Sequence, residues 1–370
     1  MSDMTKHAGP FRARAAALAA IGCVLGCAVP SHAQWTVTFL TPAGASEAHA
    51  RAAAGPQQAG SAAFGAAPHA GLWNGTAASW VDLHPAGAHA SQAHGAFGNQ
   101  QVGYATFGGL QSRASLWSGT AASWVDLSPA GSIDSAATAT SGAQQVGSAR
   151  FFGGQHHAGL WSGTAASWVD LNPIDASSSS ARGTSGTQQV GYASISGVER
   201  ASLWSGTAAS WVDLSPVGAT TSHAYGVSGG QQVGFASIGG QNRAGLWSGS
   251  AASWLDLHPA TASDSQASGT DGVYQVGYAS IAGAAHASLW NGTAASWEDL
   301  SLALPGSWFY TRAEGVWSDG ATVYVTGYGF SATTLRNEAL LWTRPVPAPG
   351  AAALLGLAGL IAARRKRRKD

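Results

Sequence analysis

The sequence predicts an all-β fold: a seven-bladed β-propeller of four-stranded antiparallel blades, closed by the N-terminal strand. Three observations predict it. A Leu-Trp dipeptide recurs seven times at spacings of 44, 44, 43, 43, 43 and 52 residues, a second Trp-led segment also recurs seven times, and the two ends of the repeat region are complementary. The Leu-Trp tryptophans are Trp73, Trp117, Trp161, Trp204, Trp247, Trp290 and Trp342.

Each repeat contains four short apolar runs set off by Gly, Ser and Pro, which is typical of strands and turns. In one copy these strands are predicted at about 181–185, 188–194, 201–204 and 211–214. Because residues two apart share one face of a strand, a four-residue loop at 119–122 would place Trp117 opposite Trp124, and Ser115 opposite Asp126. Both faces of the sheet are then largely apolar, as in a blade stacked between two others.

The two ends of the repeat region predict how the ring closes. Residues 35–42 match the last strand of a repeat but follow no Leu-Trp strand, whereas Trp342 has no such strand after it. The N-terminal strand is therefore expected to complete the last blade and to remove its open edge. The tryptophans aligned with this strand are Trp35, Trp80, Trp124, Trp168, Trp211, Trp254 and Trp297. We expect all fourteen repeat tryptophans in the core; the alternative is an aromatic ligand cage.

Residues 1–33 have the pattern of a signal peptide. Basic residues precede an apolar run at 15–29, and small residues stand at the cleavage positions before Gln34. The alternative is lipoprotein processing at Cys27. Both cysteines, Cys23 and Cys27, lie in this segment, so the propeller at 34–344 has no thiol for a disulfide, a thiolate metal site or a nucleophile.

Residues 345–370 combine a Pro-rich segment, an apolar run at 351–363 and a basic run at 364–369. The apolar run is shorter than the roughly 20 residues that span a bilayer. This order of parts resembles the PEP-CTERM sorting signal of bacterial exosortase substrates, with Ala348 in place of the Glu that names the motif. The resemblance implies an exosortase-type processing enzyme as a transient partner and membrane contact only before processing. The alternatives are a marginal membrane tail and a basic nucleic-acid patch. The sorting motif is Val346, Pro347, Ala348, Pro349 and Gly350.

The motif [Arg/His]-Ala-[Ser/Gly]-Leu-Trp is preceded by Gln-Gln-Val-Gly-Tyr and followed by Asp-Leu, as around His69–Trp73 and Arg113–Trp117. It resembles the bacterial extracellular HAF repeat over about residues 35–344, departing from it where Ser or Gly replaces an aromatic residue after Ala. The resemblance implies a secreted β-rich protein without an assigned reaction. It supplies no catalytic residue.

Charge and repeated polar positions limit the function classes. Residues 34–350 hold nine of the 18 Lys and Arg and 16 of the 18 Asp and Glu, a net charge of minus seven that disfavours nucleic-acid binding. Six Asp and six basic residues recur diagonally across a hairpin, so we expect a structural hydrogen bond or ion pair repeated in each blade rather than catalysis. They are Asp82, Asp126, Asp170, Asp213, Asp256 and Asp299 with His69, Arg113, His157, Arg200, Arg243 and His286. His84 and His258 share one repeat position but lie in distant blades, and no metal, cofactor or catalytic site is predicted.

Repeat symmetry is broken at residues 302–320, which we predict to be a binding loop, since propeller functions are usually carried on loops. The alternative is a structural plug over the closing blade. The candidate residues are Trp308, Phe309, Tyr310, Arg312, Glu314, Trp317 and Asp319.

The sequence thus predicts a secreted or surface-associated bacterial protein with a structural or interaction role in the envelope or extracellular matrix, and not an enzyme. Its expected partners are extracellular polysaccharide or surface proteins. A carbohydrate-binding propeller is the first alternative, and an extracellular hydrolase the more distant one.

Overall fold

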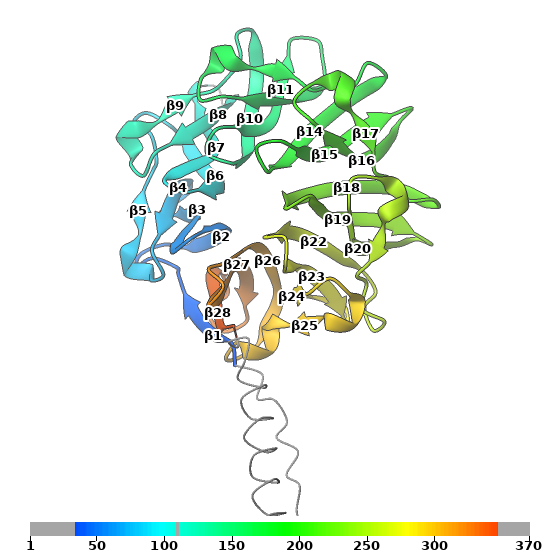
Figure 1. Ribbon diagram of the computed structural model, residues 1–370. Coiled ribbons are helices and arrows are strands. Elements are labelled where there is room, and N and C mark those ends of the chain that lie inside the picture. The colour runs from blue at the N-terminus through cyan, green and yellow to red at the C-terminus, as the bar shows by residue number, and fades with distance from the viewer. Residues whose placement is uncertain (1–33, 109–110, 347–370) are drawn as a thin grey trace, which may run out of the picture. The chain divides into compact units, whose positions relative to one another are not determined.

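The computed structural model, which describes residues 34–108 and 111–346, confirms the predicted fold class. Seven four-stranded antiparallel sheets form a seven-bladed β-propeller (Figure 1). The predicted signal peptide, residues 347–350 of the sorting motif and the basic tail lie outside the described residues. In the part of the chain that is described, no helix is long and apolar enough to cross a membrane.

In blades 1 to 6, sequence order runs from the innermost strand, next to the propeller axis, to the outermost, and in blade 7 the outermost strand is the N-terminal β1 (Figure 1). Blades 1 to 3 are β2 (Glu47–Ala54), β3 (Gln57–Ala63), β4 (Pro68–Trp73), β5 (Val81–Asp82); β6 (Ala90–Phe97), β7 (Gln100–Phe107), β8 (Gln111–Trp117), β9 (Val125–Asp126); and β10 (Ser132–Thr140), β11 (Gln145–Phe151), β12 (His156–Trp161), β13 (Val169–Asp170). Blades 4 and 5 are β14 (Ala176–Thr184), β15 (Gln189–Ile195), β16 (Val198–Trp204), β17 (Val212–Asp213); and β18 (Ala219–Ser228), β19 (Gln231–Ile238), β20 (Gln241–Trp247), β21 (Leu255–Asp256). Blades 6 and 7 are β22 (Ser265–Thr270), β23 (Gln275–Ile281), β24 (Ala284–Trp290), β25 (Glu298–Asp299); and β26 (Trp308–Ser318), β27 (Thr322–Ser331), β28 (Asn337–Pro345), β1 (Thr36–Phe39).

The third and fourth strands are joined by a 3-10 turn rather than by the predicted four-residue loop. Ser115 does pair with Asp126 as predicted, but only two residues of the outer strand join the ladder, and Trp124 caps the turn. The turn forms because the Ser123 hydroxyl donates to the Thr120 carbonyl at 2.6 Å and accepts from the Ser118 amide at 2.8 Å. The equivalent turns are η1 (Ala77–Ser79), η3 (Ala121–Ser123), η4 (Ala165–Ser167), η5 (Ala208–Ser210), η6 (Ala251–Ser253) and η7 (Ala294–Ser296), and a further turn, η8 (Leu300–Ala303), follows β25.

The N-terminal strand closes the ring as predicted, with a different register. β1 pairs with β28, and Val37 rather than Trp35 lies opposite Trp342. Trp35 is therefore not equivalent to the other outer tryptophans. Its indole instead donates to Glu298 of blade 6 at 3.1 Å and lies under the Arg344 guanidinium.

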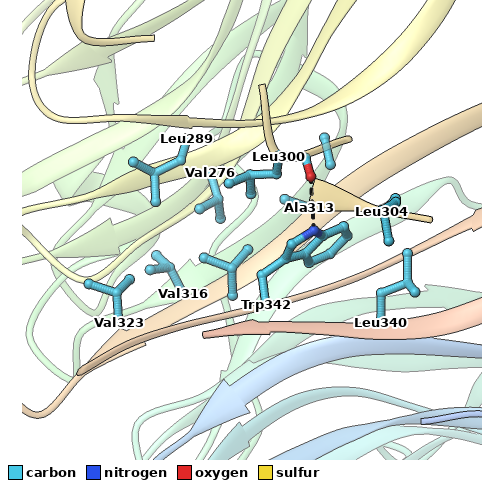
Figure 2. Close-up of a cluster of buried hydrophobic side chains, with 11 residues drawn as sticks. Val276, Leu289, Leu300, Leu304, Ala313, Val316, Val323, Leu340 and Trp342 are labelled. Atoms are coloured by element: carbon cyan, nitrogen blue, oxygen red, sulfur yellow. Dashed lines mark hydrogen bonds between the residues drawn. The ribbon is translucent and has the colours of Figure 1, made fainter. Parts of the chain in front are cut away.

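The interface of blades 6 and 7 is a cluster of buried aliphatic residues around Trp342 (Figure 2). The Trp342 indole donates to the Leu300 carbonyl at 3.0 Å. The indole nitrogens at the same position in the other six blades are buried without a partner among the described residues. Apolar packing therefore accounts for their placement.

The prediction that all repeat tryptophans are core residues is correct for the inner set only. The seven Leu-Trp tryptophans are fully buried, whereas the outer tryptophans are half-buried. The outer rings adopt two arrangements that alternate from blade to blade. In blades 1, 3 and 5 the ring covers a glycine, as Trp168 covers Gly159, where a Cβ would overlap the ring. In blades 2, 4 and 6 the indole donates to a serine, as Trp211 does to Ser202 at 2.8 Å.

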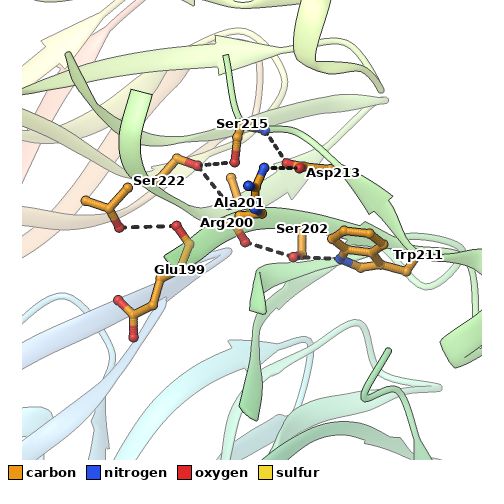
Figure 3. A network of polar contacts seen from close by, with 9 residues as sticks. Glu199, Arg200, Ala201, Ser202, Trp211, Asp213, Ser215 and Ser222 are labelled. Atoms are coloured by element: carbon orange, nitrogen blue, oxygen red, sulfur yellow. Dashed lines mark hydrogen bonds and ion pairs between the residues drawn. The ribbon is translucent and has the colours of Figure 1, made fainter. Parts of the chain in front are cut away.

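A polar network repeated between blades accounts for the Asp-Leu motif (Figure 3). Arg200 pairs with Asp213 at 2.8 Å, and the other Asp213 oxygen accepts from the Ser215 amide. The hydroxyl of Ser222, in the next blade, bonds Ser215 and accepts from the Ala201 amide. All six predicted acid–base pairs are present at 2.7–2.9 Å, so that prediction is confirmed.

Candidate functional site: the central channel

The innermost strand of every blade carries a β-bulge at the same position. The extra residue leaves the ladder, as His94 does between Ala93 and Gly95, and its side chain faces the axis of the propeller. We call these seven residues the channel ring: Arg51, His94, Thr138, Arg182, Tyr225, Ser268 and Glu314.

Small residues around the bulge explain why it forms. The glycine of the Gln-Val-Gly motif lies opposite it, and a Cβ at Gly103 would overlap the carbonyl oxygen of Gln92. The residue after the bulge faces the next blade, and a Cβ at Gly183 would come within 2.7 Å of the Tyr225 carbonyl oxygen. The inner strands therefore approach backbone to backbone, and the bulged residue is the one whose side chain is free to vary.

The channel ring separates two cavities along the axis. One has a volume of about 260 Å³ and is lined by all seven ring residues together with Gln266. The other, of about 190 Å³, shares six ring residues and continues along the small residues that follow the bulges. Two cavities therefore adjoin the ring.

Two arginines of the channel ring lack the acidic partners that the outer arginines have. Arg113, Arg200 and Arg243 each bind an aspartate at 2.8–2.9 Å. Arg51 and Arg182 form no ion pair with a described residue. Their guanidinium groups lie instead over the Tyr328 and Tyr192 rings, 6.0 and 5.5 Å from the ring centroids. The channel thus holds two guanidinium groups that contact tyrosine rings and have no ion-pair partner among the described residues.

Enclosure in the channel changes the acid–base properties of the ring. Burial, reinforced by the charges of Arg51 and Arg182, lowers the pKa of His94 to about 3. Burial raises the pKa of Glu314, although Arg51 and Arg312 oppose the shift. Burial also raises the pKa of Tyr225 to about 12. At neutral pH, His94 is therefore an uncharged imidazole and Tyr225 an uncharged phenol.

The predicted binding loop is not a loop: its central part is β26, the innermost strand of blade 7. At the start of β26, the Trp308 ring stacks on Phe39 with centroids 6.1 Å apart, and Phe309 is exposed. Further along, the Tyr310 hydroxyl donates to Asn337 at 2.6 Å, and the Arg312 guanidinium lies 4.3 Å from the centre of the Tyr278 ring.

The remaining candidates lie nearer the other end of β26. Glu314 belongs to the channel ring, and Trp317 packs against Tyr324 with centroids 5.4 Å apart. Asp319 accepts from the amides of Ala321 and Thr322 and so stabilises the turn to β27. The seven candidates are spread along a strand instead of forming one surface, and only Glu314 joins the channel ring.

The sequence contains a pattern that marks the channel ring, and the prediction of a binding loop at 302–320 did not use it. Each repeat contains Ala-x-[Ala/Gly] in its first strand, and x is the ring residue. The preceding alanine is fully buried in all seven blades. A variable position between two small residues that never vary beyond Ala and Gly could have indicated the site.

Comparison with known proteins supports the class of the fold. No family model matches the sequence, and no curated protein matches it. Among solved structures, puromycin hydrolase is similar at a TM-score of 0.55 and 12% identity, over 79% of this chain and 53% of that one. The β-propeller domain of the Trilobed protease from Pyrococcus furiosus is similar at 0.54 and 9%, over 80% and 94%.

At these identities the likeness shows the fold alone: the chain is a β-propeller protein. It spans about half the length of the puromycin hydrolase that it matches. The Pyrococcus domain is described as having an open velcro topology, whereas here β1 pairs with β28 and closes the last blade.

Proposed function

We propose that the chain is an exported bacterial interaction protein that binds its ligand in the central channel and catalyses no reaction. The observation that carries this proposal is the composition of the channel ring. Its seven equivalent positions hold six residue types, whereas the alanine before each of them is invariant within the chain. Where packing decides the residue, the repeats agree with one another; at the channel they differ.

Charge in the channel ring strengthens this argument. Enclosing an ionisable group has an energetic cost unless a partner compensates it. Ser268 and Thr138 show that small hydroxyl residues fit the same position, yet two copies carry arginine and one carries glutamate. Uncompensated charge in an enclosed site is typical of recognition, because a ligand can supply the missing partner.

Export to the cell surface or extracellular matrix rests on the segments at the two ends and on the likeness to the HAF repeat. Under this proposal an exosortase-type enzyme removes the basic tail, and the mature chain begins at Gln34. Mass spectrometry of the surface fraction tests both points. Recovery of residues 364–369 on mature protein would contradict processing of the tail, and a lipid on Cys27 would indicate lipoprotein processing instead.

Carbohydrate binding is the second candidate, favoured by the mouth of the channel. A cavity of about 640 Å³ there is lined by Phe97, Val273 and Trp317, and Phe97 and Val273 are more than half exposed. Sugar rings pack well on such aromatic faces because these offer rigid apolar area. A glycan array tests this candidate, and binding that survives Phe97→Ala and Trp317→Ala would exclude the mouth as its site.

A thermal-shift screen of the full-length protein tests channel binding. A ligand at one hundred times its Kd should stabilise the native state by about 2.7 kcal/mol. The shift should be lost in a Thr138→Trp variant, in which a large side chain fills the channel, and kept in Ser162→Trp at an exposed rim position. A ligand that shifts both variants equally binds elsewhere and would contradict the proposal.

A further inference from the structure

We propose that the channel ring binds an oxyanion, a carboxylate, sulfate or phosphate group, between the guanidinium groups of Arg51 and Arg182. This inference rests on the proposed function and names the chemical class of its ligand. The two arginines come from β2 and β14, in blades 1 and 4, and line the same cavity. An anion there would be held from two sides of the ring.

Unused hydrogen-bonding capacity favours an anion over a neutral ligand. Each guanidinium has five N–H donors in a planar fork that suits two oxygens of one oxyanion. The outer arginines use theirs on aspartates, as Arg200 does on Asp213. Arg51 and Arg182 form no such ion pair with a residue of 34–108 or 111–346. Supplying an acceptor is the contribution expected of the ligand.

The lowered pKa of His94 indicates that the charges of both arginines act at the same place. Each of their charges disfavours protonation of its imidazole, in addition to burial. A cationic ligand would meet the same repulsion. Since His94 stays uncharged and its ring bonds the Ala137 backbone, it adds no positive charge of its own to the site.

The cavity has the size and the polar lining that a hydrated anion needs. Its volume of about 260 Å³ is several times the roughly 30 Å³ that one water occupies in the liquid. The Ser268 hydroxyl and the Gln266 amide also line it and can donate to an anion or to its waters. The Tyr225 hydroxyl, which lines it too, already bonds the His223 Nδ1 at 3.1 Å. The Thr138 hydroxyl already donates to the Ala181 carbonyl at 2.8 Å, so it serves as an acceptor.

Glu314 gives the site a pH dependence of known sign. When ionised, its carboxylate opposes a bound anion; when protonated, it adds a donor. The groups around it are Arg51 in blade 1, Arg312 on its own strand, and the tyrosines Tyr278 and Tyr328, with Arg182, His94 and Tyr225 elsewhere in the ring. The pKa of His94 is about 3 and that of nearby His49 about 4, so both stay uncharged at pH 5. Anion affinity should therefore rise as pH falls through the raised pKa of Glu314.

Titration calorimetry on the full-length protein tests the inference at constant ionic strength. The probes are sulfate, phosphate, galacturonate and trigalacturonate, with galactose as the uncharged match to galacturonate. We expect at least one anion to bind, and Arg51→Gln and Arg182→Gln each to weaken it tenfold or more. Arg200→Gln, which removes a paired arginine at the rim, should leave affinity unchanged, and Glu314→Gln should abolish the rise in affinity that the wild type shows as the pH falls.

The outcomes separate the inference from the function on which it rests. If no anion binds, or if the ring variants bind as the wild type does, the oxyanion site is refuted. Should galactose or another neutral ligand then still bind in the channel, the proposed function stands. If trigalacturonate binds more tightly than galacturonate, the anionic group of the natural ligand belongs to a polymer end. If the two bind equally, the natural ligand is a free anion. If Arg51→Gln fails to fold, Arg182→Gln and the charge-preserving Arg51→Lys, expected to bind with intermediate affinity, decide the question.

Discussion

The inner and outer tryptophans of one blade should differ sharply in their contribution to stability. Trp161 is fully buried and packs into blade 2 against Val102, Leu116 and Leu127, whereas Trp168 is half-buried over Gly159. Burying about 200 Å² of indole at about 25 cal/mol per Å² corresponds to about 5 kcal/mol. We therefore expect Trp161→Ala to lower the free energy of unfolding by about 3–5 kcal/mol and Trp168→Ala by about 1–2 kcal/mol.

Urea unfolding followed by circular dichroism measures both changes in the same protein. Trp161→Phe provides the control, because the Trp161 indole nitrogen has no partner among the described residues and its loss removes no such hydrogen bond. We expect this variant to lose less than half as much stability as Trp161→Ala. Equal losses for Trp161→Ala and Trp168→Ala would refute the distinction between buried inner and half-buried outer rings.

Three further predictions follow from the closure, the alternating tryptophans and the channel. Deleting residues 34–42 removes β1 and exposes the edge of β28, so the protein should aggregate at concentrations where the intact chain is monomeric by light scattering. Gly159→Ser should cost less than about 1 kcal/mol, because Trp168 can turn to donate to the new hydroxyl, whereas Gly159→Val offers no acceptor and should cost more; equal losses in urea would contradict this. The native state resists protonation of His94 down to about pH 3, so stability should fall as pH drops from 6.5 towards 3, by at most about 1.4 kcal/mol per pH unit. A His94→Gln variant with an unchanged slope would show that other groups control acid unfolding.

Features that recur among the blades could be predicted from the sequence because the repeats constrain one another. The blade number, the closure by β1 and the pairing of Ser115 with Asp126 follow from spacing and alternation. The 3-10 turn was missed because it depends on two hydrogen bonds of the Ser123 hydroxyl. The offset at Trp35 was missed because residues 35–42 contain no such turn. Leu40 therefore aligns with the repeat leucines such as Leu127, and Val37, not Trp35, takes the position of the outer tryptophan.

The channel ring could not be predicted from strand alternation, because a bulge shifts the register within the strand. Alternation cannot show that Glu314 leaves the ladder and faces the axis, since that depends on Gly327 opposite it and on the close approach of blade 1. The density of aromatic residues near Trp308 suggested an insertion. In the structure that segment is the inner strand of an ordinary blade, and its Ala313-Glu314-Gly315 triplet aligns with those of the other six.

The alternation of glycine and serine under the outer tryptophans has a consequence for how the ring could have grown. A pattern that repeats every two blades cannot continue around an odd number of blades without a seam. The seam lies in blade 7, where Leu340 takes the glycine or serine position and pairs with Phe39 of β1. Blades 1 to 6 thus form three couples with the same glycine–serine order, and blade 7 is the closing unit. Adding or removing a couple preserves the order at the seam, whereas adding or removing a single blade inside the series of blades 1 to 6 places two like blades side by side.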